Sequence, residues 1–100
     1  MKLKILKTDI EDTLKFMRRC GYGYLRSRSG GKDSFVKRLR GELYPRFHLY
    51  IEDDGENWSF NLHLDQKAPV YRGVTAHSGD YDGVVIEREM ERIKIAFESL

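Results

Sequence analysis

The chain has little cysteine and no long apolar run, and each shortage excludes a class of protein. Cys20 is the only cysteine, so no disulfide can form within the chain, and a thiolate zinc site would need ligands from elsewhere. Its place at the end of an amphipathic pattern is typical of a buried structural thiol. No apolar stretch approaches the roughly 20 residues of a membrane span, and residues 1–16 lack the apolar core of a signal peptide. These features predict one cytoplasmic domain, residues 1–100, without a membrane partner.

Basic residues are concentrated in the first half of the chain. Residues 1–50 contain 13 Lys and Arg against 5 Asp and Glu, whereas residues 51–100 contain 5 against 11. If the fold keeps the halves apart, one surface is basic enough to attract phosphates. If the halves interleave, the charges cancel, and the small net charge of +2 is compatible with both arrangements.

Capping signals predict two helices. Thr8 followed by Glu11 forms a capping box, which indicates a helix from about residue 9 to 20 that Gly21 ends. Asp82 is the expected N-cap of a second helix at the other end of the chain. The Glu and Arg residues of that helix are expected to face solvent.

Between the helices, the pattern predicts an antiparallel sheet. Glycines at 30–31 and the Asp-Gly pair at 54–55 each indicate a hairpin, and residues 2–6 alternate as a short edge strand would. The expected fold is therefore α+β, an antiparallel four-stranded meander with an N-terminal and a C-terminal helix packed on one face. The connection 65–82 is longer than most linkers in a compact domain, which is more typical of a functional loop.

The strand "FNLHLD" (residues 60–65) alternates apolar and polar side chains. Folding the second hairpin about residues 54–55 gathers the large apolar side chains on one face, with Ile51 opposite Trp58, Leu49 opposite Phe60 and Phe47 opposite Leu62. On the polar face this register predicts His48 opposite Asn61 and Arg46 opposite His63. The two histidines would then be diagonal neighbours, about 7–8 Å apart.

Three chemistries suit such a face. His48 and His63 could act as acid and base on a phosphodiester while Arg46 neutralises the developing charge. His63 and Asp65 could instead join His77 around a divalent metal ion. In the third, Tyr50 and Asn61 belong to a platform that contacts bases or another protein without catalysis.

The first hairpin adds basic and aromatic residues beside this face. In nucleic-acid-binding proteins, basic side chains of this kind bind the sugar-phosphate backbone and aromatic rings stack on unpaired bases. The alternative explanation is that Lys and Arg at sheet edges prevent aggregation. The candidate contacts are Tyr24, Arg26, Arg28, Lys32, Lys37 and Arg38.

Over residues 20–83 the arrangement of "CGYGYLRSRSGG", "PRFHLYI", "FNLHLDQKAPVYRG" and "AHSGDYDG" resembles a group of small prokaryotic proteins of unknown function, so this resemblance implies no activity. In topology alone, the helix–sheet–helix layout is similar to small double-stranded-RNA-binding-like domains, which include toxin ribonucleases. Their catalytic histidine after the first glycine turn is missing, because Lys32, Asp33 and Ser34 stand there.

The leading hypothesis is a nucleic-acid-binding domain that binds RNA or single strands in preference to duplex DNA. Whether it also cleaves phosphodiesters with His48, His63 and Arg46 is left open by the sequence. The alternative is a metal-binding or protein-interaction module without catalysis.

Overall fold

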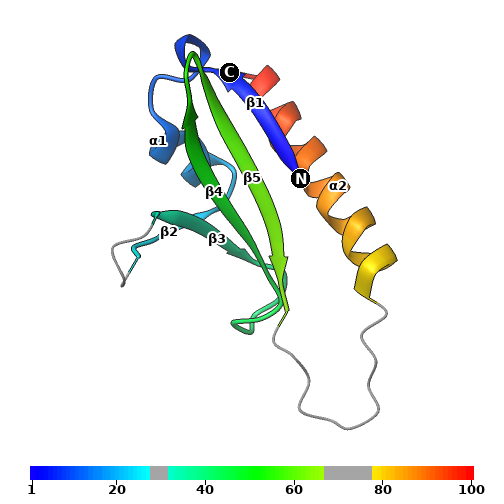
Figure 1. The fold of residues 1–100 in the computed structure, drawn as a ribbon. Coiled ribbons are helices and arrows are strands. Elements are labelled where there is room, and N and C mark those ends of the chain that lie inside the picture. Colours follow the sequence, from blue (N-terminus) through cyan, green and yellow to red (C-terminus); the bar gives the residue numbers. More distant parts are fainter. Residues whose placement is uncertain (28–31, 67–77) are drawn as a thin grey trace, which may run out of the picture.

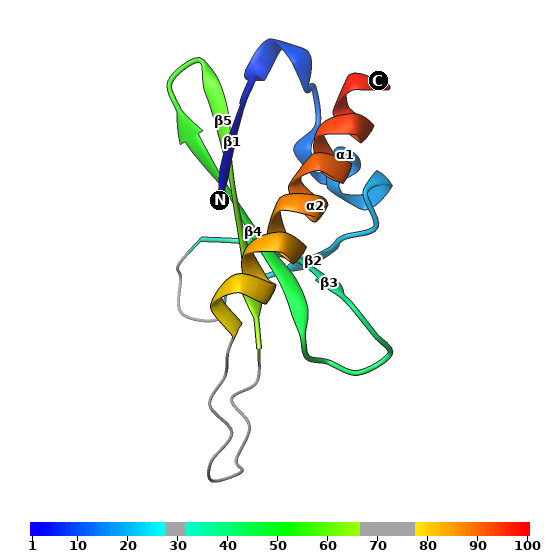
Figure 2. The ribbon, with the colours of Figure 1, turned by 90° about the vertical axis from the view of Figure 1, so that its right-hand side faces the viewer.

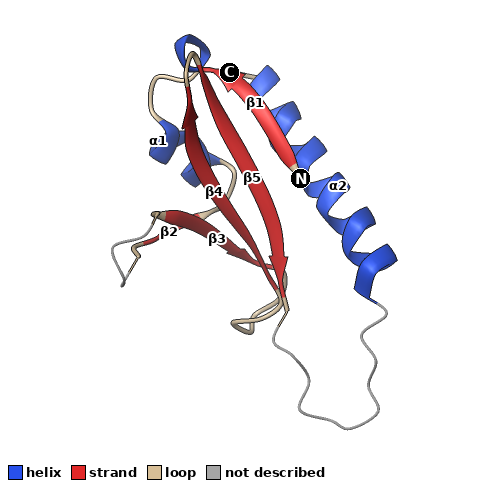
Figure 3. Ribbon diagram, in the orientation of Figure 1, coloured by secondary structure: helices blue, strands red, loops and turns tan. Residues whose placement is uncertain are grey.

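The computed structural model describes residues 1–27, 32–66 and 78–100, and of residues 78–82 the backbone alone. It confirms the α+β class, with strands in one antiparallel sheet (Figures 1 and 3). No helix in these segments is long and apolar enough to cross a membrane. The elements are β1 (Lys2–Leu6), a 3₁₀ helix η1 (Lys7–Asp9), α1 (Thr13–Arg19), β2 (Gly23–Leu25), β3 (Ser34–Arg38), β4 (Arg46–Asp54), β5 (Asn57–Asp65) and α2 (Ser78–Glu98).

The sheet has five strands in the order β1-β5-β4-β3-β2, where the sequence predicted a four-stranded meander. The meander itself is present as β2 to β5. The fifth strand is β1, which confirms the short edge strand expected at residues 2–6. It pairs antiparallel with β5 from Lys2 opposite Asn61 to Leu6 opposite Asn57. This pairing completes the backbone hydrogen bonds of β5 on its second side, so both long strands, β4 and β5, lie inside the sheet.

Both helices pack on one face of the sheet. Phe16 of α1 lies edge-on to Phe60 of β5, with 6.1 Å between ring centroids, and to Phe97 of α2 at 6.4 Å. Figure 2 shows α1 beside the C-terminal half of α2. Among the described residues, the fully buried side chains therefore lie between the helices and the central strands, with Leu49 of β4 and Ile93 of α2 at 0% exposure. The opposite face of the sheet has neither α1 nor α2 over it.

The register of the second hairpin differs from the prediction by two residues. Asp54 pairs with Asn57, so the turn is residues 55–56. Gly55 has a φ of 65°, and no described residue other than a glycine has a positive φ. A positive φ at the first central position only is the pattern of a type II′ turn, whereas folding about 54–55 would place the glycine second. A shift of two residues keeps every side chain on its predicted face but changes its partner.

The helix starts also differ from the prediction. Thr8 lies in η1, and Asp12 is the residue that caps α1, its Oδ1 accepting the Lys15 backbone N–H at 3.1 Å. Between them Ile10 is extended and only 4% exposed, because the chain turns inward to bury this side chain before the helix begins. The second helix begins at Ser78, four residues before the predicted cap Asp82.

One acidic side chain expected in solvent is buried. Glu89 of α2 is 6% exposed and accepts hydrogen bonds from the Tyr22 hydroxyl at 2.5 Å and from Arg92 Nε at 2.7 Å. Arg92 also donates to the Cys20 carbonyl at 2.7 Å, which ties α2 to the segment after α1. Burial, reinforced by the Glu89 hydrogen bond, raises the pKa of Tyr22, and burial likewise raises the pKa of Cys20. Cys20 is 2% exposed, which confirms the expected buried thiol.

Candidate functional site

The open face, the side of the sheet away from the helices, carries the predicted polar side chains of β4 and β5. In the observed register His48 lies directly opposite His63, and Tyr50 opposite Asn61. The histidines are therefore direct partners, and the predicted diagonal arrangement is wrong. Direct cross-strand partners lie closer together than diagonal ones, so the site is more compact than the sequence suggested.

Three rings lie in a row on this face. The imidazole of His48 is stacked on Tyr50, with centroids 4.5 Å apart and an interplanar angle of 27°. The Tyr50 ring meets His63 edge-on at 5.9 Å. His63 is exposed and the other two are partly buried, so His63 and Tyr50 present the more accessible end of the row.

His48 is held by hydrogen bonds at both ring nitrogens. Its Nδ1 lies 2.7 Å from Asp65 Oδ2, and its Nε2 lies 2.7 Å from Ser34 Oγ. In a neutral imidazole whose Nδ1–H donates to the carboxylate, Nε2 accepts the hydroxyl proton of Ser34. Neither nitrogen is then directed at a ligand, so the structure does not support His48 as half of a two-histidine acid–base pair.

Ser34, His48 and Asp65 have the connectivity of a hydrolytic triad but the opposite order of exposure. Ser34 is 3% exposed, the His48 side chain 12% and the Asp65 side chain 32%. A nucleophile has to meet the substrate, so its hydroxyl belongs at the accessible end of such a chain. Here the carboxylate is at that end. The arrangement fixes the His48 ring rather than presenting a nucleophile.

The sequence missed Ser34. It stands on β3 opposite Tyr50, so strand alternation alone would have placed it on the open face. Its link to His48 and Asp65 joins three strands and depends on the exact pairing of each.

Arg46 is held as well. Its Nε lies 3.4 Å from Asp65 Oδ2, and its guanidinium lies over the Tyr44 ring at 4.7 Å from the centroid. The Arg46 side chain is 14% exposed. It would have to leave both partners to neutralise a substrate phosphate.

The proposed metal ligands are only partly placed. His63 and Asp65 project from the same side of β5, as predicted, but Asp65 is occupied by His48 and Arg46. His77 lies outside the described residues. Within the segments that the structure describes, no three His, Cys, Asp or Glu side chains are grouped closely enough to hold a metal ion.

The predicted basic and aromatic contacts divide between the two faces. Arg38 lies opposite Arg46 and shares the open face, whereas Lys37 pairs with Phe47 and Tyr24 with Phe35 on the helix side. Of the others, Arg26 is exposed just after β2, Lys32 forms an ion pair with Glu52 at 3.1 Å, and Arg28 lies outside the described residues.

Comparisons of the chain with protein-family models, curated proteins and solved structures find no match. The geometry of the open face is therefore the basis for a functional proposal.

Proposed function

We propose that the open face binds single-stranded nucleic acid, RNA or DNA, by stacking bases on Tyr50 and His63. The observation that carries this proposal is the row of rings on β4 and β5, on a face with neither α1 nor α2 over it. Stacking on aromatic side chains is worth about 1–3 kcal/mol per base and accepts every base. Asn61, opposite Tyr50, adds a donor and an acceptor beside the rings.

Phosphate contacts would come from basic residues around the rings. Lys2 and Lys4 of β1 lie opposite Asn61 and Ser59, and on the other side of the rings Arg38 of β3 lies opposite Arg46. Lys4 is paired with Asp54 at 2.9 Å, with side chains 62% and 47% exposed. A pair this exposed contributes less than about 1 kcal/mol, so a phosphate can replace the carboxylate at little cost.

Binding without cleavage is the activity that these contacts favour. A two-histidine cleavage mechanism needs a free nitrogen on each ring, and both nitrogens of His48 are engaged. Cleavage by His48, His63 and Arg46 stays a prediction. It is checked by incubating labelled RNA with the protein and looking for shorter products that His63→Ala abolishes.

Fluorescence anisotropy with a short unstructured labelled RNA tests the proposal. Tyr50→Leu should weaken binding by about 5- to 150-fold, the equivalent of one lost stacking contact. Tyr50→Phe keeps the ring and should bind within about twofold of the unmodified protein. The matched control is Tyr24→Leu, since Tyr24 is 47% exposed but faces the helix side, and it should have no effect.

Urea unfolding of each variant shows whether it is folded under the binding conditions. The proposal fails if no RNA or single-stranded DNA binds at low salt. It also fails if folded Tyr50→Leu binds as tightly as Tyr24→Leu.

A further inference from the structure

The strand β1 is at the edge of the sheet, and no other strand of the described segments pairs with its outer side. At its start, the backbones of Met1 and Leu62 exchange hydrogen bonds of 3.2 and 2.8 Å. Alternate residues of an antiparallel strand bond to the same neighbour, so the odd-numbered residues of β1 bond to β5. The N–H and C=O groups of Lys2 and Lys4 therefore point outward, where a further strand would lie.

A hollow of about 420 Å³ adjoins this outer edge. Consecutive residues of β1, 3–6, line it together with Phe97 of α2. A hollow over the face of a strand is lined by alternate residues, whereas one along its edge is lined by consecutive ones. Leu3 and Ile5 of β1 and Phe97 of α2 make up its apolar part. The remaining lining residues are Asp9, Asn57, Lys94 and Glu98.

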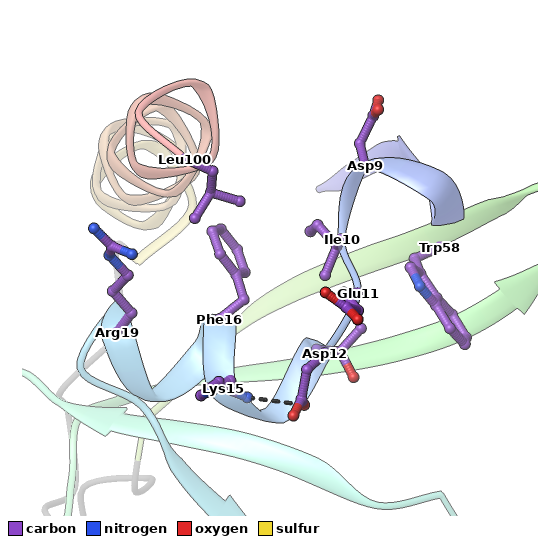
Figure 4. A pocket seen from close by; sticks show the side chains of 10 residues that line it. Asp9, Ile10, Glu11, Asp12, Lys15, Phe16, Arg19, Trp58 and Leu100 are labelled. Atoms are coloured by element: carbon purple, nitrogen blue, oxygen red, sulfur yellow. Dashed lines mark hydrogen bonds between the residues drawn. The ribbon is translucent and has the colours of Figure 1, made fainter.

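The hollow lies on the side of α2 that faces away from α1. Figure 1 shows β1 beside the C-terminal half of α2. Lys94 lines the hollow and follows Arg92 by two residues, which is roughly 200° around a helix. Arg92 donates to the Cys20 carbonyl just after α1, and Phe16 of α1 points toward Leu100 beyond α2 (Figure 4). The helix α1 therefore covers the other side of α2 and leaves this hollow open.

An open strand edge beside an apolar hollow is the geometry in which proteins bind an extended segment of a partner as an additional strand. The side chains of an added strand alternate between the two faces of the sheet. Those on the helix side would enter the hollow beside Leu3 and Phe97, which suits apolar residues. Those on the open face would lie opposite Lys2 and Lys4, where acidic residues form favourable cross-strand pairs.

The lysines of β1 argue against a second copy of the same strand as the occupant. An antiparallel pair of β1 strands centred on Lys4 would place this residue opposite Lys4 of the second copy. Like charges directly opposite each other are destabilising, and lysine on an edge strand is a common protection against self-pairing. An acidic strand meets no such repulsion. The ion pair of Lys4 with Asp54 is no obstacle, because it is largely exposed and therefore weak.

We propose that β1 pairs with an extended segment of another protein in which acidic and apolar residues alternate. The acidic side chains lie opposite Lys2 and Lys4, and an apolar side chain between them fills the hollow against Leu3 and Phe97. This interaction goes beyond the proposed binding of nucleic acid. The two share the lysine side chains, whereas the outward backbone groups and the hollow belong to this interaction alone.

The probe is the labelled peptide Ser-Glu-Val-Glu-Val-Glu-Ser, followed by fluorescence anisotropy, and it should bind saturably. Replacing its glutamates by lysines should weaken binding at least about tenfold, because attraction to the lysines of β1 becomes repulsion. Replacing its valines by serines should weaken binding at least about fivefold, because the apolar contact in the hollow is lost.

Two substitutions at one position separate the charge from the backbone. Lys4→Ala keeps the outward N–H and should weaken peptide binding by about two- to fivefold, as expected for an exposed ion pair. Lys4→Pro also removes that N–H, which an edge strand tolerates where the nitrogen faces solvent. It should bind about three- to tenfold more weakly than Lys4→Ala, because one more hydrogen bond is missing. The matched control is Lys15→Ala, an exposed lysine of α1 that does not line the hollow, and it should change nothing.

Amide hydrogen exchange tests the pairing in the unmodified protein, and it decides the question even if Lys4→Pro does not fold. The Lys4 amide points outward and should become protected when the peptide binds. The Leu3 amide is already bonded to β5 and should change much less.

The proposal is overturned if no peptide binds, if the glutamate and lysine peptides bind equally, or if the peptide leaves the Lys4 amide unprotected. Equal binding by folded Lys4→Pro and Lys4→Ala would also contradict it. A dimer that protects the Lys4 amide without peptide would show that a second copy occupies the edge. Tyr50→Leu should bind the peptide normally, and Lys4→Pro should bind RNA as Lys4→Ala does. A failure here therefore leaves the nucleic-acid proposal untouched, and the converse also holds.

Discussion

Replacing the two opposed histidines by alanine, one at a time, should separate stability from binding. In His48→Ala, the Ser34 hydroxyl loses its acceptor while only 3% exposed, which costs about 1–3 kcal/mol. The lost stack on Tyr50 adds about 0.5–1.5 kcal/mol. The Asp65 side chain is 32% exposed and still has Arg46 as a partner, so the loss of its contact with His48 adds less than about 1 kcal/mol. The expected destabilisation is therefore about 1.5–5.5 kcal/mol.

His63→Ala should cost only about 0.5 kcal/mol, because His63 is exposed. Urea unfolding followed by Trp58 fluorescence measures both variants. With the same slope of roughly 1–3 kcal/mol per molar urea in both variants, His48→Ala should lower the midpoint by at least about 0.5 M, and by at least about three times as much as His63→Ala. In the RNA-binding assay the order should reverse, with folded His63→Ala the weaker binder of the two at low temperature.

A double-mutant cycle checks the hydrogen bond between Ser34 and His48 itself. Each single alanine variant leaves the other partner unsatisfied, whereas the double variant leaves neither. The double variant should therefore cost at least about 1 kcal/mol less than the sum of the single variants. Additive costs, or equal costs for His48→Ala and His63→Ala, would show that the chain from Ser34 to Asp65 does not hold His48.

Three further outcomes follow from the structure. Tyr22→Phe removes the hydroxyl that donates to buried Glu89 and should cost about 1–3 kcal/mol in urea unfolding. Folding raises the pKa of Tyr22, so its contribution to stability is complete below the unfolded pKa of about 10 and is lost as pH rises above that value. Between neutral and alkaline pH, Tyr22→Phe should therefore lose less stability than the unmodified protein does. Gly55→Ala should cost about 1 kcal/mol through its positive φ alone, since an added Cβ meets nothing within 4 Å; a neutral effect would contradict the observed turn. The metal hypothesis for His63 and Asp65 predicts that zinc raises the melting temperature and that His63→Ala removes the rise, and identical melting curves with zinc and with chelator would count against it.

The sequence was sufficient to assign side chains to faces but not to pair them. Alternation put His48, Tyr50 and His63 on one side of the sheet, and the structure agrees. Pairing depends on which two residues form the turn, and an Asp-Gly pair is compatible with glycine at either central position. That single ambiguity moved every cross-strand partner within the second hairpin by two residues.

The different roles of His48 and His63 could not be predicted from the sequence, and the reason is not the turn. By pattern, His48 and His63 are equivalent, since both alternate with large apolar residues on long strands. What distinguishes them is Ser34, 14 residues from His48 along the chain, and Asp65, 17 residues away. Contacts at that separation follow from the pairing of three strands, which no local signal specifies. The burial of Glu89 has the same origin, because its partner Tyr22 is 67 residues away.

Among the described residues, the fold offsets part of the charge asymmetry of the chain, which bears on how nucleic acid would be held. Lysines from the basic half pair with carboxylates from the acidic half at Lys4–Asp54, Lys7–Asp53 and Lys32–Glu52. The β1–β5 and β3–β4 pairings bring these partners together, so each of these three lysines has a carboxylate beside it. Binding that relied on many phosphates would lose affinity steeply with salt, with a slope of about −0.7 per phosphate on single strands. With only two to four phosphates neutralised, the expected slope is about −1.5 to −3, and the affinity has to come mainly from stacking. A slope much steeper than this, with Tyr50→Leu unaffected, would show that phosphate contacts and not the rings of the open face hold the strand.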